Sequence, residues 1–246
     1  MRYEILGPLR VDDERGSSPL GAQRLATLLA VLLIRSDQVV SAEQISRELW
    51  GETPPHRTTA TLYVCISRLR KFLDRPGRRN PILTRPGGYM LCRAASECDA
   101  DVFERLMAVG RKDARSGQPE AAATSFDSAM ELWRGAPLAN VRSGPLVTGF
   151  RRRLDEMRIE CSEMFAQARL DLGRHEEVIA PLRSLVTEFP LREIFYRQLM
   201  LALYRSDRKS EALGIYDSAC RVLDRETGLE PGRDLRQLRH AVLASL

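Results

Sequence analysis

The sequence predicts a mainly α-helical protein with a small amount of β-structure, organised as two domains. Three observations support this prediction. Apolar residues recur at helical spacing through most of the 246 residues, strand-like alternation occurs only before residue 98, and the excess of positive charge lies in that same region. Residues 1–97 contain 15 Lys and Arg against 10 Asp and Glu, whereas residues 98–246 contain 23 of each sign. A chain of this length can form two domains that each bury a core.

The first predicted elements are short strands followed by a helix. Residues 2–11 mix strand-forming residues with a Gly-Pro break, and residues 12–19 form a polar segment with Gly and Ser that is typical of a turn. Together they predict a small antiparallel sheet. Residues 22–35 place leucines at spacings of 3, 4, 7 and 8, which predicts an amphipathic helix packed on a core.

Two more helices are predicted before residue 75. The sequence Ser-Ala-Glu-Gln at residues 41–44 is a capping box, in which the Ser hydroxyl and the Gln side chain each satisfy a free backbone N–H. It predicts a helix that ends at Trp50, where a glycine and then two prolines follow. The next helix is predicted over residues 60–74, with Thr58 or Thr59 as its N-cap.

The helix over residues 60–74 has two faces. Its inward stripe is predicted to comprise Leu62, Cys65, Ile66, Leu69, Phe72 and Leu73. Its outward face carries Thr61, Val64, Ser67, Arg68 and Lys71, with Arg70 at the edge. Two short strand patterns follow within residues 82–91, around a Pro-Gly-Gly sequence. Three helices followed by a β-hairpin predict a winged helix-turn-helix domain over residues 1–95.

From Cys98 the pattern is wholly helical and predicts an all-α domain over residues 98–246. We expect a capped helix start near Asp101, a helix boundary at residues 117–119 and a long helix over residues 145–172. An internal repeat of 34 residues relates Gly173, Glu177, Ile179, Leu182 and Leu185 to Asp207, Glu211, Leu213, Tyr216 and Ala219, and a weaker copy starts at Gly117. This is the tetratricopeptide period, so a tetratricopeptide-like domain with a protein-binding groove is predicted.

The positive charge is concentrated around the predicted third helix and hairpin. Residues 57–93 contain nine basic residues and one acidic residue, a balance suited to contact with phosphates. We therefore expect the protein to bind double-stranded DNA, because an α-helix fits the major groove and can read base edges there. The residues expected to face bases are Thr61, Val64, Ser67, Arg68 and Lys71. Arg57 and Arg70 are expected to hold the DNA backbone, and Arg85 to enter the flanking minor groove.

The sequence offers little support for an enzyme. Its three histidines are isolated, and neither a nucleophile motif nor a phosphate-binding loop occurs. The five cysteines are scattered without metal-ligand spacing and are expected to be small core residues. We expect no catalytic site, no cofactor and no metal. No apolar run is long enough to cross a bilayer and the N-terminus lacks a secretory signal, so we expect a cytoplasmic, nucleoid-associated protein with no membrane partner.

Several short motifs resemble those of a known family. Ile-Ser-Arg-Leu-Arg at residues 66–70 and Gly-Tyr at residues 88–89 resemble the recognition helix and wing of OmpR/PhoB-type winged helices. Leu-Trp-Gly at residues 49–51, with the prolines at 54 and 55, resembles the same domain in the Streptomyces antibiotic regulatory protein family. In the C-terminal half, residues 191–193, 198–205, 211–213 and 227–232 resemble that family's bacterial transcriptional activation domain.

This resemblance implies a transcription activator of a secondary-metabolite, often antibiotic, biosynthetic gene cluster. Members of the family bind direct repeats that overlap the −35 region of a promoter, stand side by side on DNA, and contact the sigma and alpha subunits of RNA polymerase. We therefore expect promoter DNA and RNA polymerase as partners, and a side-by-side homodimer on DNA. Tyr63 and Cys65 depart from the family's recognition helix. We expect neither the ATPase module of longer relatives nor a receiver domain ahead of the winged helix.

A second hypothesis remains open. The chain is also compatible with a tetratricopeptide-like interaction adaptor whose winged helix docks a protein rather than DNA. Salt distinguishes the two hypotheses, because DNA affinity falls steeply as salt rises, whereas a docking module would not bind a duplex at all.

Overall fold

The computed structural model of the chain divides into two compact units. The structure describes residues 1–13, 16–93, 96–142 and 144–245. The first unit comprises Met1–Arg105 and Ala129–Arg158, and the second comprises Leu106–Ser128 and Ile159–Leu246. Residues 129–158, which the sequence assigns to the helical domain, therefore belong to the compact unit that contains the N-terminal residues.

A four-stranded sheet opens the first unit. Its strands are β1 (Arg2–Glu4), β2 (Arg10–Asp13), β3 (Gly16–Pro19) and β7 (Glu97–Cys98), in the order β3-β2-β1-β7. β1 pairs antiparallel with β2 and parallel with β7, and β2 pairs antiparallel with β3. The polar segment predicted to be a turn is therefore mostly strand. Its polar residues fit there because the ladder between β2 and β3 uses backbone groups, whatever the side chains are.

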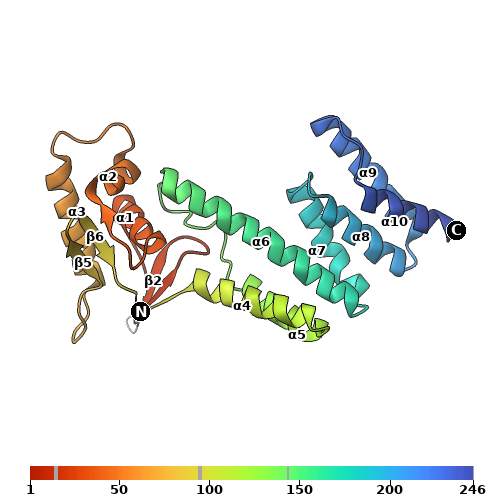
Figure 1. Cartoon of the computed structure of the whole chain (residues 1–246), viewed down its shortest axis with the longest axis horizontal. Helices are drawn as coiled ribbons and strands as arrows, with labels where there is room; N and C mark the ends of the chain where they lie inside the picture. The colour runs from red at the N-terminus through yellow and green to blue at the C-terminus, as the bar shows by residue number, and fades with distance from the viewer. Residues whose placement is uncertain (14–15, 94–95, 143, 246) are drawn as a thin grey trace. The chain divides into compact units, whose positions relative to one another are not determined.

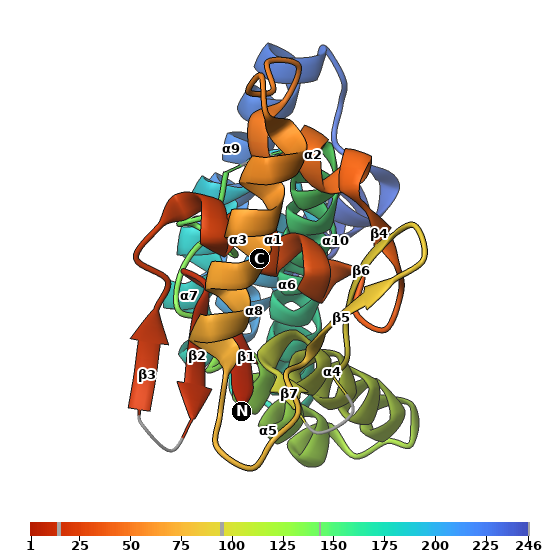
Figure 2. The same cartoon turned by 90° about the vertical axis from the view of Figure 1, so that its left-hand side faces the viewer.

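Three helices and a second sheet complete the winged helix-turn-helix. The helices are α1 (Gln23–Ile34), α2 (Ala42–Trp50) and α3 (Thr58–Leu73). The sheet contains β4 (Val40–Ser41), β5 (Ile82–Arg85) and β6 (Gly88–Leu91) in the order β4-β6-β5. Figures 1 and 2 show the β5–β6 hairpin, which is the wing, beside α3. The predicted fold of this part is confirmed, with α1 buried through its middle by residues such as Leu28, Leu29 and Leu32.

The starts of α2 and α3 differ in how they are capped. In α2 the capping box is complete, because Ser41 Oγ accepts from the Gln44 N–H and Gln44 Oε1 accepts from the Ser41 N–H, both at 3.1 Å. In α3 the predicted N-cap is wrong: Arg57 is the N-cap residue and its side chain makes no capping hydrogen bond. Thr58 is the first residue inside the helix, and its hydroxyl donates to the carbonyl oxygen of Pro55 at 2.6 Å.

Buried carboxylates attach residues 129–158 and the start of α4 (Asp99–Arg115) to the strands and helices of the first unit. Asp99 accepts from the N–H groups of Ile5, at 2.8 and 2.9 Å, and Leu6, at 3.0 Å. Glu48 of α2, which is 4% exposed, accepts from the Leu146 N–H at 2.7 Å. This bond satisfies a free donor at the first turn of the helix that begins at residue 145, where a negative charge is favourable.

The predicted helix start at Asp101 is placed two residues too late. α4 begins at Asp99, so Asp101 lies in its first turn. The carboxylate of Asp101 forms an ion pair with Arg93 at 2.6 Å rather than capping the helix. The start was misplaced because the β7 strand immediately precedes α4, and a two-residue strand leaves no periodic signal in the sequence.

The second unit is a stack of helices, to which α6 contributes its residues from Ile159 onward. After α4 come α5 (Pro119–Met130), α6 (Pro145–Asp171), α7 (His175–Glu188), α8 (Glu193–Arg205), α9 (Lys209–Thr227) and α10 (Arg233–Ala244). α8 packs against α7, α9 and α10 (Figure 1). Gly117, Gly173 and Asp207 each have a positive φ, of 69°, 74° and 57°, just before α5, α7 and α9. The repeat of 34 residues therefore relates the turn at Gly173 to the turn at Asp207, as a tetratricopeptide-like fold requires, whereas the turn at Gly117 lies 56 residues before Gly173.

Two apolar clusters hold α6 to α10 together. One includes Leu182, Phe195 and Leu203, and the other includes Tyr196 and Met200. Within the described residues, no helix is both long and apolar enough to span a membrane.

Candidate nucleic-acid interface

The inward face of α3 fixes the orientation of its outward face. Leu62, Ile66 and Leu69 are at most 2% exposed and pack into the core of the first unit. The predicted inward stripe is correct, except that Phe72 is only half-buried. Cys65 also faces the core, and burial raises the pKa of its thiol. Although it lies in the helix predicted to read DNA, Cys65 is therefore not on the surface that a base could reach.

The outward face of α3 presents the predicted base-facing residues to solvent. Ser67, Arg68 and Lys71 are exposed, and Val64 is 50% exposed. Thr61 is half-buried, and its hydroxyl donates to the carbonyl oxygen of Arg57 at 3.0 Å. The Thr61 oxygen therefore keeps accepting capacity only, which suits a base amino group better than a phosphate oxygen.

Arg70 is placed differently from the other basic residues of α3. Its Nε donates to the carbonyl oxygen of Ile82 at 3.2 Å, and its Nη2 donates to Thr84 Oγ1 at 2.8 Å. Both acceptors belong to β5. Asn80 adds a second link, because its Nδ2 donates to the Arg70 carbonyl oxygen at 2.8 Å. The Arg70 side chain thus joins the helix to the wing, a role that the sequence did not indicate.

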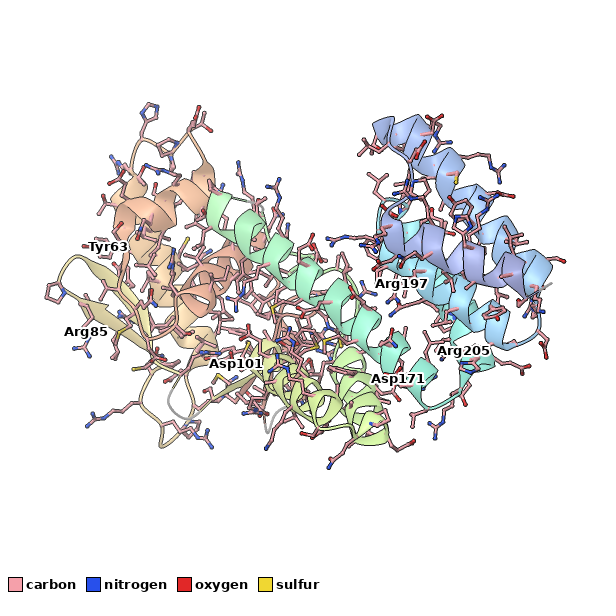
Figure 3. All side chains as sticks on the ribbon, turned by 45° about the vertical axis from the view of Figure 1, so that its right-hand side comes forward. Tyr63, Arg85, Asp101, Asp171, Arg197 and Arg205 are labelled. Atoms are coloured by element: carbon pink, nitrogen blue, oxygen red, sulfur yellow. The ribbon has the colours of Figure 1, made fainter. Side chains whose placement is uncertain are left out.

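The wing ends in a tight turn that carries Arg85. Arg85 pairs with Gly88 across the hairpin, so that Pro86 and Gly87 form the two-residue tip. Gly87 has a φ of 85°, which glycine adopts without steric cost. Arg85 is exposed, and Figure 3 shows Arg85 and Tyr63 pointing outward from the wing and from α3 of the first unit. The helix and the wing therefore present basic and polar groups on one module.

The basic residues between 57 and 93 divide into two groups. Arg75 and Arg93 are used internally, in ion pairs with Asp13 and Asp101. The exposed cations that form no ion pair with another described residue are Arg57, Arg68, Lys71, Arg79 and Arg85. These five side chains are the interface cations. Such unpaired charges gain most from contact with phosphates, because binding releases the counterions condensed on DNA.

Tyr63 is a further candidate for contact with DNA, although its sequence position marks it only as a departure from the family's recognition helix. It is 61% exposed, the largest exposed fraction among the large apolar side chains of α3. Its position one helical turn before Ser67 places it on the outward face, and that spacing is the signal that could have identified it. Tyr63 offers an aromatic ring and a hydroxyl to whatever α3 binds.

Family models cover most of the chain. A model described as "Bacterial transcriptional activator domain" matches residues 98–243. A second, described as "Transcriptional regulatory protein, C terminal", matches residues 20–91, which contain α1 to α3 and the wing.

Similar proteins are found in Streptomyces and in mycobacteria. The regulatory protein AfsR of Streptomyces griseus is 34% identical over 99% of this chain, and the chain spans only 24% of AfsR. The transcriptional regulatory protein MoaR1 of Mycobacterium tuberculosis is 33% identical over the whole chain, and 80% of MoaR1 is covered. The regulatory protein DnrI of Streptomyces peucetius is 31% identical over 99% of this chain, with 92% of DnrI covered.

A solved structure has the same fold. Mycobacterium tuberculosis EmbR, solved in complex with a low-affinity phosphopeptide, superposes with a TM-score of 0.93 at 32% sequence identity. The superposition covers 99% of this chain and 65% of the EmbR chain.

Proposed function

Because the chain belongs to the Streptomyces antibiotic regulatory protein family of transcriptional activators, we propose that it activates a secondary-metabolite gene cluster by binding DNA near a promoter. The sites are direct repeats beside the −35 element, and the activated genes belong to an antibiotic pathway. Mycobacterial relatives share the architecture, so the genes that flank the binding sites decide which pathway is controlled.

The observation that carries the proposal is the face of α3. On this face, exposed polar and basic side chains stand opposite a stripe buried at 7% exposure or less, apart from half-buried Phe72. A helix held in this way can enter the major groove without losing its packing. Arg68 and Lys71 reach guanine edges, Ser67 and Thr61 bond to bases, and Val64 contacts a thymine methyl group.

The interface cations outside this face fix the register. Arg57 at the start of α3 holds a phosphate, and Arg85 at the wing tip enters the adjacent minor groove. Arg70 keeps its place between α3 and β5, so it supports the phosphate contacts by orienting the wing instead of making them alone. Tyr63 adds an aromatic contact at the edge of the reading face.

Activation is assigned to the helices beyond residue 98. Their charges balance, with 23 of each sign, so a general attraction to phosphate does not draw them to DNA. They recruit RNA polymerase through its sigma and alpha subunits. Two protomers stand side by side on repeats about one helical turn apart, because each then meets the same face of the DNA.

The decisive experiment is selection of bound fragments from the source genome, followed by footprinting. We expect recovered fragments to carry tandem repeats beside promoters. The double variant Arg68→Ala, Lys71→Ala should lose protection of those repeats at concentrations where the wild type protects them. The matched control is Lys112→Ala, Arg115→Ala, which removes the same charge from exposed positions of α4 and should protect normally.

Two results would contradict the proposal in different ways. Unchanged footprints from the Arg68→Ala, Lys71→Ala protein would show that another face reads DNA. Recovery of random fragments, with no duplex binding above background, would favour the adaptor hypothesis, in which the winged helix docks a protein.

A further inference from the structure

A cavity of about 590 Å³ lies in the second unit, between α6, α8 and the turn from α4 to α5. Its volume falls within the range of roughly 300–1,000 Å³ that is usual for binding sites. Ala114, Met164 and Ala168 supply apolar lining, and five polar side chains face them: Glu163, Gln167, Asp171, Arg197 and Gln198. Asp171 Oδ1 already accepts a hydrogen bond from Gln167 Nε2 at 2.8 Å. Figure 3 shows Asp171 on α6 and Arg197 on α8, the two long helices that border the cavity.

Gln198 is the most unusual side chain of the lining. It is 1% exposed, and its Nε2 donates to the carbonyl oxygen of Glu163 at 2.9 Å. That bond fixes the amide, and its Oε1 has no hydrogen-bond partner among the described residues. A buried acceptor of this kind is costly unless a donor reaches it. The Oε1 atom itself has less than 1 Å² of exposed surface, so a ligand N–H reaches it only if the Gln198 side chain shifts within the cavity wall.

The charges around Gln198 favour a cationic ligand. Glu163 and Asp171 stand eight residues apart on α6, a spacing that places them on one face. Arg197 is the single cation of the lining, and no ion pair joins it to another described residue. Burial raises the pKa of Glu163, and its neighbour Glu160 raises it further, although Arg197 and Arg192 oppose the shift. A ligand cation would therefore stabilise the ionised form of the Glu163 carboxylate, which its neighbouring cations stabilise only in part.

We propose that this cavity binds a basic peptide segment of a partner protein. A lysine or arginine side chain of the segment lays its aliphatic stem on Met164 and Ala168 and donates to the Glu163 carboxylate. Arg197 donates to a peptide carbonyl oxygen or to an acidic neighbour of that residue. A peptide is favoured over a small amine because stacked helix pairs offer concave surfaces that hold extended chains. This site needs no DNA and goes beyond the proposed function.

The experiment uses the full chain and a phage-displayed library of random linear heptapeptides. We expect enriched peptides to share a lysine or arginine beside an apolar residue. The best of them, made synthetically with a fluorophore, should bind the wild type in an anisotropy titration. Replacing its cationic residue by norleucine or citrulline should weaken binding about tenfold or more, since a charge-assisted hydrogen bond is lost.

Two pairs of variants test the location. Glu163→Gln should weaken peptide binding about tenfold, whereas Glu188→Gln, which alters an exposed carboxylate away from the cavity, should not. Ala114→Trp should block the cavity, whereas Ala108→Trp should leave binding unchanged. Both alanines are exposed on α4, so the substitutions carry similar risks to folding, and circular dichroism checks each variant.

The proposal is overturned if no peptide is enriched, if the enriched peptides are acidic, or if they bind the Ala114→Trp protein as well as the wild type. The proposal is also overturned if free agmatine displaces the peptide and binds with the same affinity as the peptide, because the site would then recognise a small amine. All of these readouts are independent of DNA binding, so a protein that fails to bind promoters can still pass this test.

Discussion

At the scale of single residues, arginines two positions apart on one helix serve different ends. Arg68 is exposed to solvent, whereas Arg70 is half-buried and donates to two oxygens of β5. The planar guanidinium suits Arg70 because its donors have a fixed geometry that reaches both acceptors at once. Position on the helix, and not residue type, therefore distinguishes the arginine that we propose to read DNA from the one that supports the wing.

Arg70→Lys tests this division. A lysine keeps the charge but cannot bond both the Ile82 carbonyl and Thr84 Oγ1 in the same geometry. We expect faster hydrogen exchange of the β5 amides, by roughly fivefold for the loss of about 1 kcal/mol, together with weaker DNA binding. Arg85→Lys is the control. Arg85 makes no such bonds, so the hydrogen exchange of the β5 amides should not change in this variant. Normal β5 protection in Arg70→Lys would show that only the charge matters.

At the scale of elements, the wing is attached to the helix-turn-helix through β4. Ser41 pairs with Gly88 of β6 and also caps α2, so one residue belongs to both the sheet and the helix. The backbones of β4 and β6 approach closely at this point. A Cβ added to Gly88 would lie 2.0 Å from the Val40 carbonyl oxygen and 3.0 Å from the Ser41 Cα. Glycine is therefore required at position 88. The atoms that a Cβ would contact belong to the backbone of β4, which cannot move aside as the end of a flexible side chain could.

Gly88→Ala is therefore expected to destabilise the first unit. The backbone of β4 must shift to admit the methyl group, and overpacking of this kind costs about 1–3 kcal/mol. Urea unfolding measures the change. Gly149→Ala is the matched control, because Gly149 is an exposed residue of α6 with nothing within 4 Å of the added Cβ. That control should be neutral or stabilising by up to about 1 kcal/mol. Equal stability of the Gly88→Ala protein would refute the steric argument.

At the scale of the whole molecule, charge separates the chain into a basic N-terminal part and a balanced helical part. Residues 1–97 carry five more positive than negative charges, whereas residues 98–246 carry equal numbers of both signs. Ion pairs with Asp13 and Asp101 occupy Arg75 and Arg93, and the five interface cations remain exposed. These five are available to phosphates, so affinity for DNA should depend on them and on salt.

DNA affinity should fall steeply as salt rises. The slope of log affinity against log salt has an upper limit of about −4.5 per protomer, reached if every interface cation neutralises one phosphate, and Arg57→Ala, which removes a phosphate contact, lowers its magnitude by about 1. Anisotropy titrations on a repeat-containing duplex between 50 and 200 mM salt measure it. Lys112→Ala leaves the slope unchanged, because Lys112 lies on α4. A slope near zero would be incompatible with phosphate contact and would support protein docking instead.

Features that depend on neighbours along the chain can be predicted from the sequence. The capping box at Ser41, the buried stripe of α3 and the 34-residue repeat follow from spacings of a few residues or from self-similarity, so they can be recognised without coordinates. The same periodicity placed Ser67, Arg68 and Lys71 on the exposed face. The start of α3 was misplaced, because the cap residue is Arg57, and the N-cap preference of threonine does not show at which residue the backbone becomes helical.

The tertiary structure is needed to know which polar groups that are distant in sequence form hydrogen bonds with each other. Arg70 contacts residues 12 and 14 positions away, Glu48 accepts from a helix 98 positions away, and Gln198 bonds to a carbonyl 35 positions away. Each partner is selected by how separate elements pack, and a hydrogen bond requires its two atoms to come within about 3 Å. Spacing along the sequence carries no record of that approach, so the support of the wing and the unpaired acceptor of the cavity emerged only from the fold.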